Sequence, residues 1–112
     1  MKERRQEAGS APARFIVFDT ETPNRRCDRM CSVGVCLVEE GRILGQAYAL
    51  VDPEEPFEAF HVRLHGIGPR TVAGQPNFAA LWKRLEPPFS SGVLVAHNAP
   101  FDMAVLARCL RD

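Results

Sequence analysis

The sequence lacks three features that would each indicate a class of protein. Its 14 Lys and Arg residues are balanced by 14 Asp and Glu residues, so the formal net charge of zero gives no argument for a nucleic acid partner. No apolar stretch approaches the roughly 20 residues that span a bilayer. The charged N-terminus also has no apolar core of the kind found in signal peptides. These absences predict a cytoplasmic protein with no membrane partner.

Paired cysteines are also missing. The chain has four cysteines, none in a CxxC arrangement, at Cys27, Cys31, Cys36 and Cys109. In a reducing compartment such cysteines are expected to be free thiols. The spacing of the first three does not match that of the common zinc motifs, although a zinc site is the alternative use for them.

The length and composition indicate one globular domain. The chain has 112 residues, of which 46% are hydrophobic and 25% charged, and single domains typically contain about 50 to 200 residues. Residues 1–13 are polar, charged or small without periodicity, which predicts a flexible tail. Residues 14–112 are then expected to form the domain.

The hydrophobic pattern predicts a mixed α/β sheet. The first strand is apolar at successive positions, which is typical of a central strand covered on both faces. The next two strands are joined by a short turn and should form an antiparallel hairpin. A helix that ends before Pro87 and Pro88 leads to a further strand, which should run parallel to the first through a right-handed crossover. We expect strands at residues 14–18, 31–38, 43–51 and 93–96, helices at 76–85 and from about 101, and mostly loop at 57–74.

The final helix has no stop signal. No Gly or Pro follows its last periodic residue, and the chain ends at Asp112. We therefore expect the domain to continue in a longer protein. The missing elements would leave apolar surface exposed.

Two carboxylates lie at the end of the first strand, in the stretch FDTET at residues 18–22. Side chains alternate along a strand, so Asp19 and Glu21 share a face with Phe15 and Val17 and are expected to continue a buried apolar column. The alternative is a frayed strand end that carries two solvated acids.

A third carboxylate, Asp102, lies on the final helix. It is in register with Val105, Leu106 and Cys109 and has no basic residue three or four positions away. A capping role is the alternative. If the three acids meet at about 5 Å, each pair repels by roughly 3 kcal/mol at an effective dielectric constant near 20, so the group requires a cation. Oxygen ligands suit Mg²⁺ or Mn²⁺, and carboxylate clusters hold such ions in two-metal sites.

These motifs and their order resemble those of the DEDD exonuclease superfamily. FDTET is followed by HGI at residues 65–67 and by HNAPFD at residues 97–102. The likeness is to DnaQ-like exonucleases such as the proofreading epsilon subunit of bacterial DNA polymerase III. It implies a ribonuclease H-like fold, two divalent cations (Mg²⁺ or Mn²⁺), and release of nucleoside monophosphates from the 3′ end of single-stranded nucleic acid, with DNA favoured. The implied protein partners are a DNA polymerase or repair factors.

The resemblance also implies residue roles. The catalytic metal ligands it predicts are Asp19, Glu21 and Asp102. The substrate-binding residues it predicts are Thr20, Thr22, His65, Ile67 and Asn98. Packing is the alternative role for Ile67, and ordering of the strand-to-helix turn is the alternative for Asn98.

One part of the family pattern is missing. The third motif, a fourth aspartate preceded by a histidine base or a tyrosine, has no counterpart after Asp102. Residues 14–112 therefore resemble the N-terminal portion of an exonuclease domain, and the 112-residue chain is expected to have little activity. Two alternatives stay open. One is a catalytically incomplete module that binds nucleic acid or a polymerase, and the other is an exoribonuclease like RNase T or oligoribonuclease. The arginines of the loop at residues 23–29 could contact phosphates or be solvated.

Overall fold

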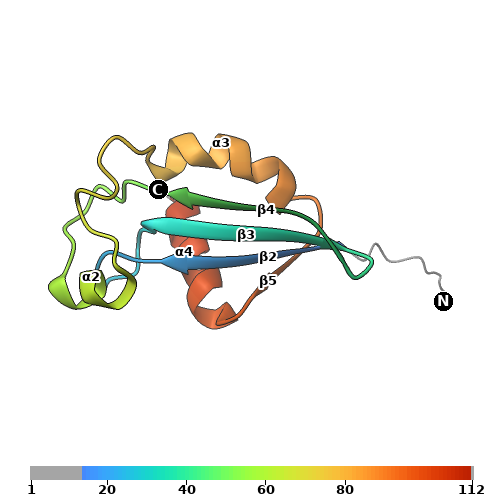
Figure 1. Ribbon diagram of the computed structural model, residues 1–112, viewed down its shortest axis with the longest axis horizontal. Helices are drawn as coiled ribbons and strands as arrows, with labels where there is room; N and C mark the ends of the chain where they lie inside the picture. The colour runs from blue at the N-terminus through green and yellow to red at the C-terminus, as the bar shows by residue number, and fades with distance from the viewer. Residues whose placement is uncertain (1–13, 112) are drawn as a thin grey trace.

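The computed structural model describes residues 14–111 (Figure 1). They form a four-stranded sheet, two longer helices, one short helix and the loops that connect them. The predicted tail at residues 1–13 lies outside the described residues. The strands are β2 (Arg14–Glu21), β3 (Ser32–Glu39), β4 (Arg42–Leu50) and β5 (Val93–Ala96). The helices are α2 (Ala59–His65), α3 (Phe78–Phe89) and α4 (Ala99–Arg111).

The order of the strands across the sheet is β4-β3-β2-β5. β2 pairs antiparallel with β3, β3 pairs antiparallel with β4, and β2 pairs parallel with β5. The predicted mixed sheet, hairpin and parallel strand are therefore confirmed. Because Phe18 pairs with Ala96, the last residue of β5, the next residues along the chain, Asp19 in β2 and His97 after β5, lie at the same edge of the sheet.

One face of the sheet is covered and the other is open. Ile16 and Phe18 point toward α3 and α4 and form the core with Leu81, Val105 and other apolar residues. The opposite face leaves apolar side chains exposed among the described residues: Phe15 is 40% exposed, Val93 56% and Val95 38%. The expectation that β2 is covered on both faces was wrong, because both longer helices pack on the same side (Figure 1). Asp19 and Glu21 therefore end an open column, not a buried one.

The elements differ from the predicted ones mainly at their ends. α3 begins after Asn77, whose side chain accepts the Ala80 backbone N–H, and continues through Pro87 and Pro88 to Phe89. The prolines do not stop this helix, because they lie in its last turn, where their fixed φ is compatible with helix and few hydrogen bonds are lost. The predicted loop at 57–74 contains the seven-residue helix α2. Within residues 14–111 no helix is long and apolar enough to cross a membrane.

Candidate active site

Asp102 is held in place by Thr20. Asp102 is 1% exposed, and its neighbours on the buried face of α4 are Val105, Leu106 and Cys109, as the sequence pattern predicted. Its Oδ1 atom accepts a hydrogen bond from the Thr20 backbone N–H at 3.0 Å and a second from the Thr20 hydroxyl at 2.6 Å. The carboxylate of α4 is thereby fixed to the end of β2.

This contact was not predicted from the sequence. Thr20 alternates with Ile16 and Phe18 on the covered face of β2, and that alternation was the only local sign that its hydroxyl turns toward the helices. Both hydrogen-bond donors of Thr20 are used by Asp102. A contact between Thr20 and a substrate stays a prediction.

Glu21 lies within electrostatic reach of the two other carboxylates. Burial raises the pKa of Glu21 above its usual value, His65 lowers it, and the charges of Asp19 and Asp102 raise it further. Asp19 is exposed, on the open face of the sheet. The three acids are therefore brought to one end of β2, where they repel one another.

Replacing Glu21 with glutamine is expected to stabilise the metal-free chain. A carboxyl group whose folded-state pKa is raised stabilises the fold below its unfolded pKa, and this contribution is lost as the pH rises through the folded pKa. At pH 7 the Glu21→Gln chain should melt about 2 to 4 °C above the wild type, a modest gain because solvent partly screens the charges. Thermal melts in EDTA at pH 7 and pH 4 measure the difference, which should shrink at the lower pH. Glu40→Gln, on an exposed turn, is the control, and a lower melting temperature for Glu21→Gln at pH 7 would count against a raised pKa of Glu21.

His65 connects α2 to the end of β2. Its Nδ1 atom accepts the Ile67 backbone N–H at 3.1 Å, so the proton of the neutral ring lies on Nε2, which is 2.7 Å from the Thr22 carbonyl oxygen and donates to it. Ile67 is buried and packs with Cys31 and Val72. The structure thus shows positioning and packing contacts for His65, Thr22 and Ile67, and their predicted substrate contacts stay predictions.

Cys31 lies next to this connection and is fully buried. Its backbone N–H donates to the Glu21 carbonyl oxygen at 2.7 Å, and burial together with the charge of Glu21 raises the pKa of its thiol to about 12. The usual value is 9.0. All four cysteines are free thiols, as predicted.

Cys31 is therefore expected to resist alkylation in the folded chain. At pH 8 a pKa raised from 9.0 to about 12 lowers the thiolate fraction, and with it the rate of reaction with iodoacetamide, roughly 1,000-fold relative to the unfolded chain. Mass spectrometry of peptides from folded and guanidinium-unfolded protein measures both rates. Equal rates in the two states would show that Cys31 is accessible to solvent and reagent in the folded chain.

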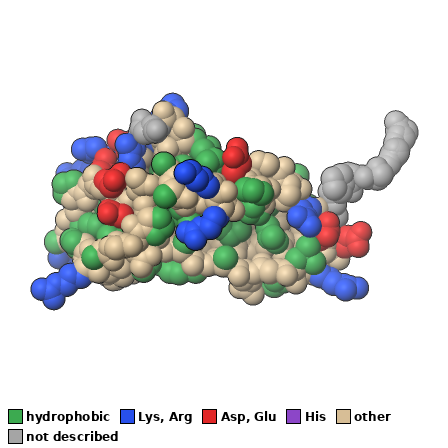
Figure 2. Space-filling model, turned by 90° about the horizontal axis from the view of Figure 1, so that it is seen from above, with side chains coloured by type: hydrophobic (Ala, Val, Ile, Leu, Met, Phe, Trp, Pro, Cys, Tyr) green, Lys and Arg blue, Asp and Glu red, His purple; other side chains and the backbone are tan. Residues whose placement is uncertain are grey.

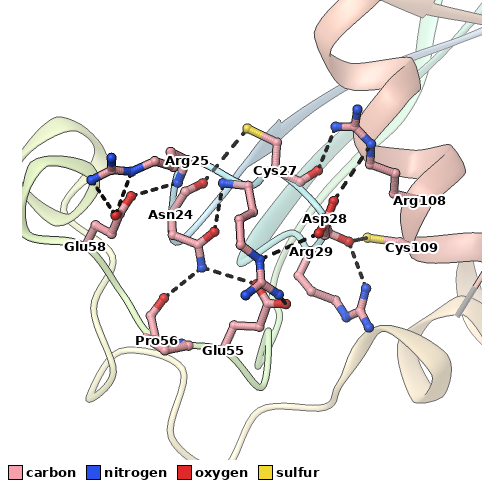
Figure 3. A network of polar contacts seen from close by, with 11 residues as sticks. Asn24, Arg25, Cys27, Asp28, Arg29, Glu55, Pro56, Glu58, Arg108 and Cys109 are labelled. Carbon is pink, nitrogen blue, oxygen red and sulfur yellow. Dashed lines mark hydrogen bonds and ion pairs between the residues drawn. The ribbon is translucent and has the colours of Figure 1, made fainter.

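The loop after β2 is tied to the segment before α2 by ion pairs (Figure 3). The backbone N–H and the guanidinium of Arg25 both bond to Glu58, with the ions 2.9 Å apart, and this guanidinium lowers the pKa of the Glu58 carboxyl. Arg26 pairs with Glu55 at 2.6 Å. Asn24 donates to Glu55 and to the Pro56 carbonyl oxygen. These arginines hold the loop together through ion pairs while their side chains stay 83% and 62% exposed, which agrees with the alternative of a solvated loop, and a contact with phosphates stays a prediction.

Asn98 and His97 join β5 to α4. The Asn98 carbonyl oxygen accepts the backbone N–H groups of Phe101 and Asp102, which agrees with a turn-ordering role, and a substrate contact stays a prediction. His97 is exposed and lines a shallow hollow of about 410 Å³ on the open face together with Asp19, Gly34 and Tyr48.

The three acids offer donor atoms of the type that binds hard divalent cations. Asp19, Glu21 and Asp102 supply only carboxylate oxygens, the ligands that Mg²⁺ and Mn²⁺ prefer, and the pKa of Glu21 is raised mainly by burial and further by the charges of the two other acids. In the described part of the chain, however, no three His, Cys, Asp or Glu side chains are already gathered as a metal-holding group. Cation binding at these three residues thus stays a prediction.

Comparison with known proteins relates this arrangement to nucleases. The sequence model of the exonuclease family matches residues 16–112. A DNA polymerase III subunit epsilon-like protein of Rhodobacter capsulatus is 37% identical over 99 residues, which cover 84% of this chain and 14% of that protein. The chain thus spans about one seventh of the length of this relative.

Solved structures give the same relationship. Exonuclease X, solved in complex with 5′ overhanging duplex DNA, has a TM-score of 0.67 and 28% identity, over 81% of this chain and 52% of its own. Exonuclease I in complex with an inhibitor has a TM-score of 0.80 at 18% identity, over 91% of this chain and 25% of its own. The second likeness concerns the fold alone, which is ribonuclease H-like, as the sequence predicted.

Proposed function

This chain belongs to the DEDD 3′–5′ exonuclease family, and on that premise we propose that Asp19, Glu21 and Asp102 are the divalent-cation ligands of a nuclease site. The observation that carries the proposal is that Thr20 fixes the buried carboxylate of Asp102 to the end of β2, the strand that also carries Asp19 and Glu21. The family uses divalent metal ions. For this chain we propose two, Mg²⁺ or Mn²⁺.

The proposed activity is removal of nucleotides from the 3′ end of a single strand, with DNA favoured. Bound cations would supply a metal-activated water and stabilise charge on the phosphate. Asp19 is accessible from the open face, where a strand end can approach. His65 fixes the Thr22 carbonyl and thus the backbone that carries Glu21. A DNA polymerase or repair factor as protein partner, and a cytoplasmic location, belong to the same proposal.

A single-strand degradation assay tests the proposal. A 5′-labelled oligonucleotide should be shortened from its 3′ end in Mg²⁺ or Mn²⁺, slowly, and not in EDTA. Asp19→Asn should remove this activity, whereas Glu40→Gln, a matched loss of one exposed acid, should leave it intact. Degradation that survives EDTA or Asp19→Asn would contradict the assignment.

A second function is favoured by one contact. Oδ1 of Asp102 already accepts two hydrogen bonds from Thr20, which suits a structural carboxylate in a module that binds nucleic acid without cutting it. The same assay separates the two functions, because a module that only binds would leave the labelled oligonucleotide at full length in every buffer. Replacing DNA with RNA in the assay tests the exoribonuclease alternative.

A further inference from the structure

Strand β4 is an open edge of the sheet. Within the described residues it pairs with β3 alone, so the other side of its backbone has hydrogen-bonding groups available for another strand. Its nine residues, RILGQAYAL, contain no proline and carry one charge, on Arg42 at the beginning. The pairing with β3 has one bulge, near this beginning at Leu44, and the six residues from Gly45 to Leu50 pair regularly. Protected edge strands usually carry charges, prolines or bulges in the middle, because bare edges pair with other chains.

A groove runs along this edge on the side of α3. Small residues of β4, Gly45, Ala47 and Ala49, face the helix residues Leu81 and Leu85 across about 520 Å³ of space. A Cβ atom built on Gly45 meets no heavy atom within 4 Å. The groove is thus wide enough, and apolar enough, to receive side chains of an added strand.

One charged side chain, the basic Arg84, lines the groove. Arg84 borders the groove and also the neighbouring hollow beside Tyr48 and Leu50. Arg84 forms no ion pair with any residue of 14–111. Figure 2, which views the molecule from the α3 side, shows basic side chains standing among hydrophobic ones there. An occupant of the groove would therefore gain from carrying carboxylates.

The geometry points to β4 and the α3 groove as a docking site for an extended peptide of another protein. The peptide adds a strand to the sheet, places apolar side chains of alternate residues in the groove, and presents carboxylates on the same face to Arg84. This docking site does not involve the nuclease residues.

Fluorescence anisotropy with two capped, labelled peptides tests the docking site. The probe Glu-Thr-Val-Thr-Val-Thr-Glu places its valines and glutamates on one face of a strand, and Lys-Thr-Val-Thr-Val-Thr-Lys is its charge-reversed match. The acidic probe should bind at least about tenfold more tightly. Arg84→Glu should reverse the preference. Gly45→Val, which fits the backbone but fills the groove, should weaken binding of the acidic probe about tenfold.

Controls make each outcome decisive. Arg63→Glu reverses another exposed charge, on α2, and should leave the binding of both peptides unchanged, and circular dichroism verifies that every variant folds. Equal binding of the two peptides, or no binding up to about 1 mM, would overturn the proposal. A dimer detected by sedimentation of the chain alone, and abolished by Gly45→Val, would also overturn it, because a second copy of the chain would then occupy the β4 edge. Nuclease assays are not needed, so failure here leaves the proposed activity untouched.

Discussion

Replacing Asp102 with alanine is expected to lower the free energy of unfolding by about 2 to 4 kcal/mol, equivalent to a fall of roughly 10 °C or more in melting temperature. The change leaves the backbone N–H and the hydroxyl of Thr20 without their shared acceptor, in a position where Thr20 is almost fully buried. It also opens a small cavity at the start of α4. Urea unfolding followed by circular dichroism measures the effect.

The matched control for this change is Asp102→Asn. An asparagine keeps the shape and one side-chain oxygen, so it can still accept both hydrogen bonds from Thr20, and we expect a loss of at most about 1 kcal/mol. It removes the charge, however, so the affinity for divalent cations should fall. If alanine and asparagine proved equally stable, the contact with Thr20 would not be what holds the carboxylate at the end of β2.

A polypeptide of these 112 residues is expected to release 3′ nucleotides at least about 100-fold more slowly than a full-length exonuclease of the family assayed beside it. Residues 103–112 contain no histidine or tyrosine and one acid, Asp112. The chain therefore offers three of the four expected carboxylates and no third-motif base. Loss of a general base typically lowers the rate by about 10² to 10⁴, and loss of a ligand weakens cation binding as well.

Single-turnover release of the terminal nucleotide at saturating Mg²⁺ measures this rate. Asp19→Asn sets the background, and Mn²⁺ in place of Mg²⁺ shows whether weak cation binding limits the reaction. Turnover within about tenfold of the full-length enzyme would mean that the third motif contributes far less than general acid–base catalysis usually does.

Local sequence predicted the elements of the sheet but not which face is covered. The apolar runs of β2, β3 and β5 and the turn before β4 fixed the strands within a few residues. In β2, both Phe15 and Ile16 are apolar, so the pattern could not distinguish a covered face from an open one. That depends on where α3 and α4 pack, a property of the whole fold. Pro87 and Pro88 led to a predicted helix end that is too early. A proline ends a helix when it lies in the interior but is tolerated in the last turn, and its position relative to the helix end is not visible in the local sequence.

In the candidate site, too, local pattern predicted which side chains are buried or share a face but not which residues they contact. The apolar stripe of α4 correctly predicted that Asp102 is buried, and the spacing of Asp19 and Glu21 correctly placed them on one face of β2. The partners were beyond the reach of local pattern. Thr20 and Asp102 are 82 residues apart in sequence, and Thr22 and His65 are 43 apart. The acids that pair with Arg25 and Arg26 are likewise more than 25 residues away in sequence.

The central claim is that Asp19, Glu21 and Asp102 together hold a divalent cation. Calorimetric titration of Mn²⁺ into metal-stripped protein tests it most directly, because it needs neither substrate nor a complete catalytic site. We expect saturable binding that Asp19→Asn weakens at least about tenfold, with Glu40→Gln indistinguishable from the wild type. Equal affinity for Mn²⁺ in the wild type and in Asp19→Asn, or no binding at all, would contradict the claim.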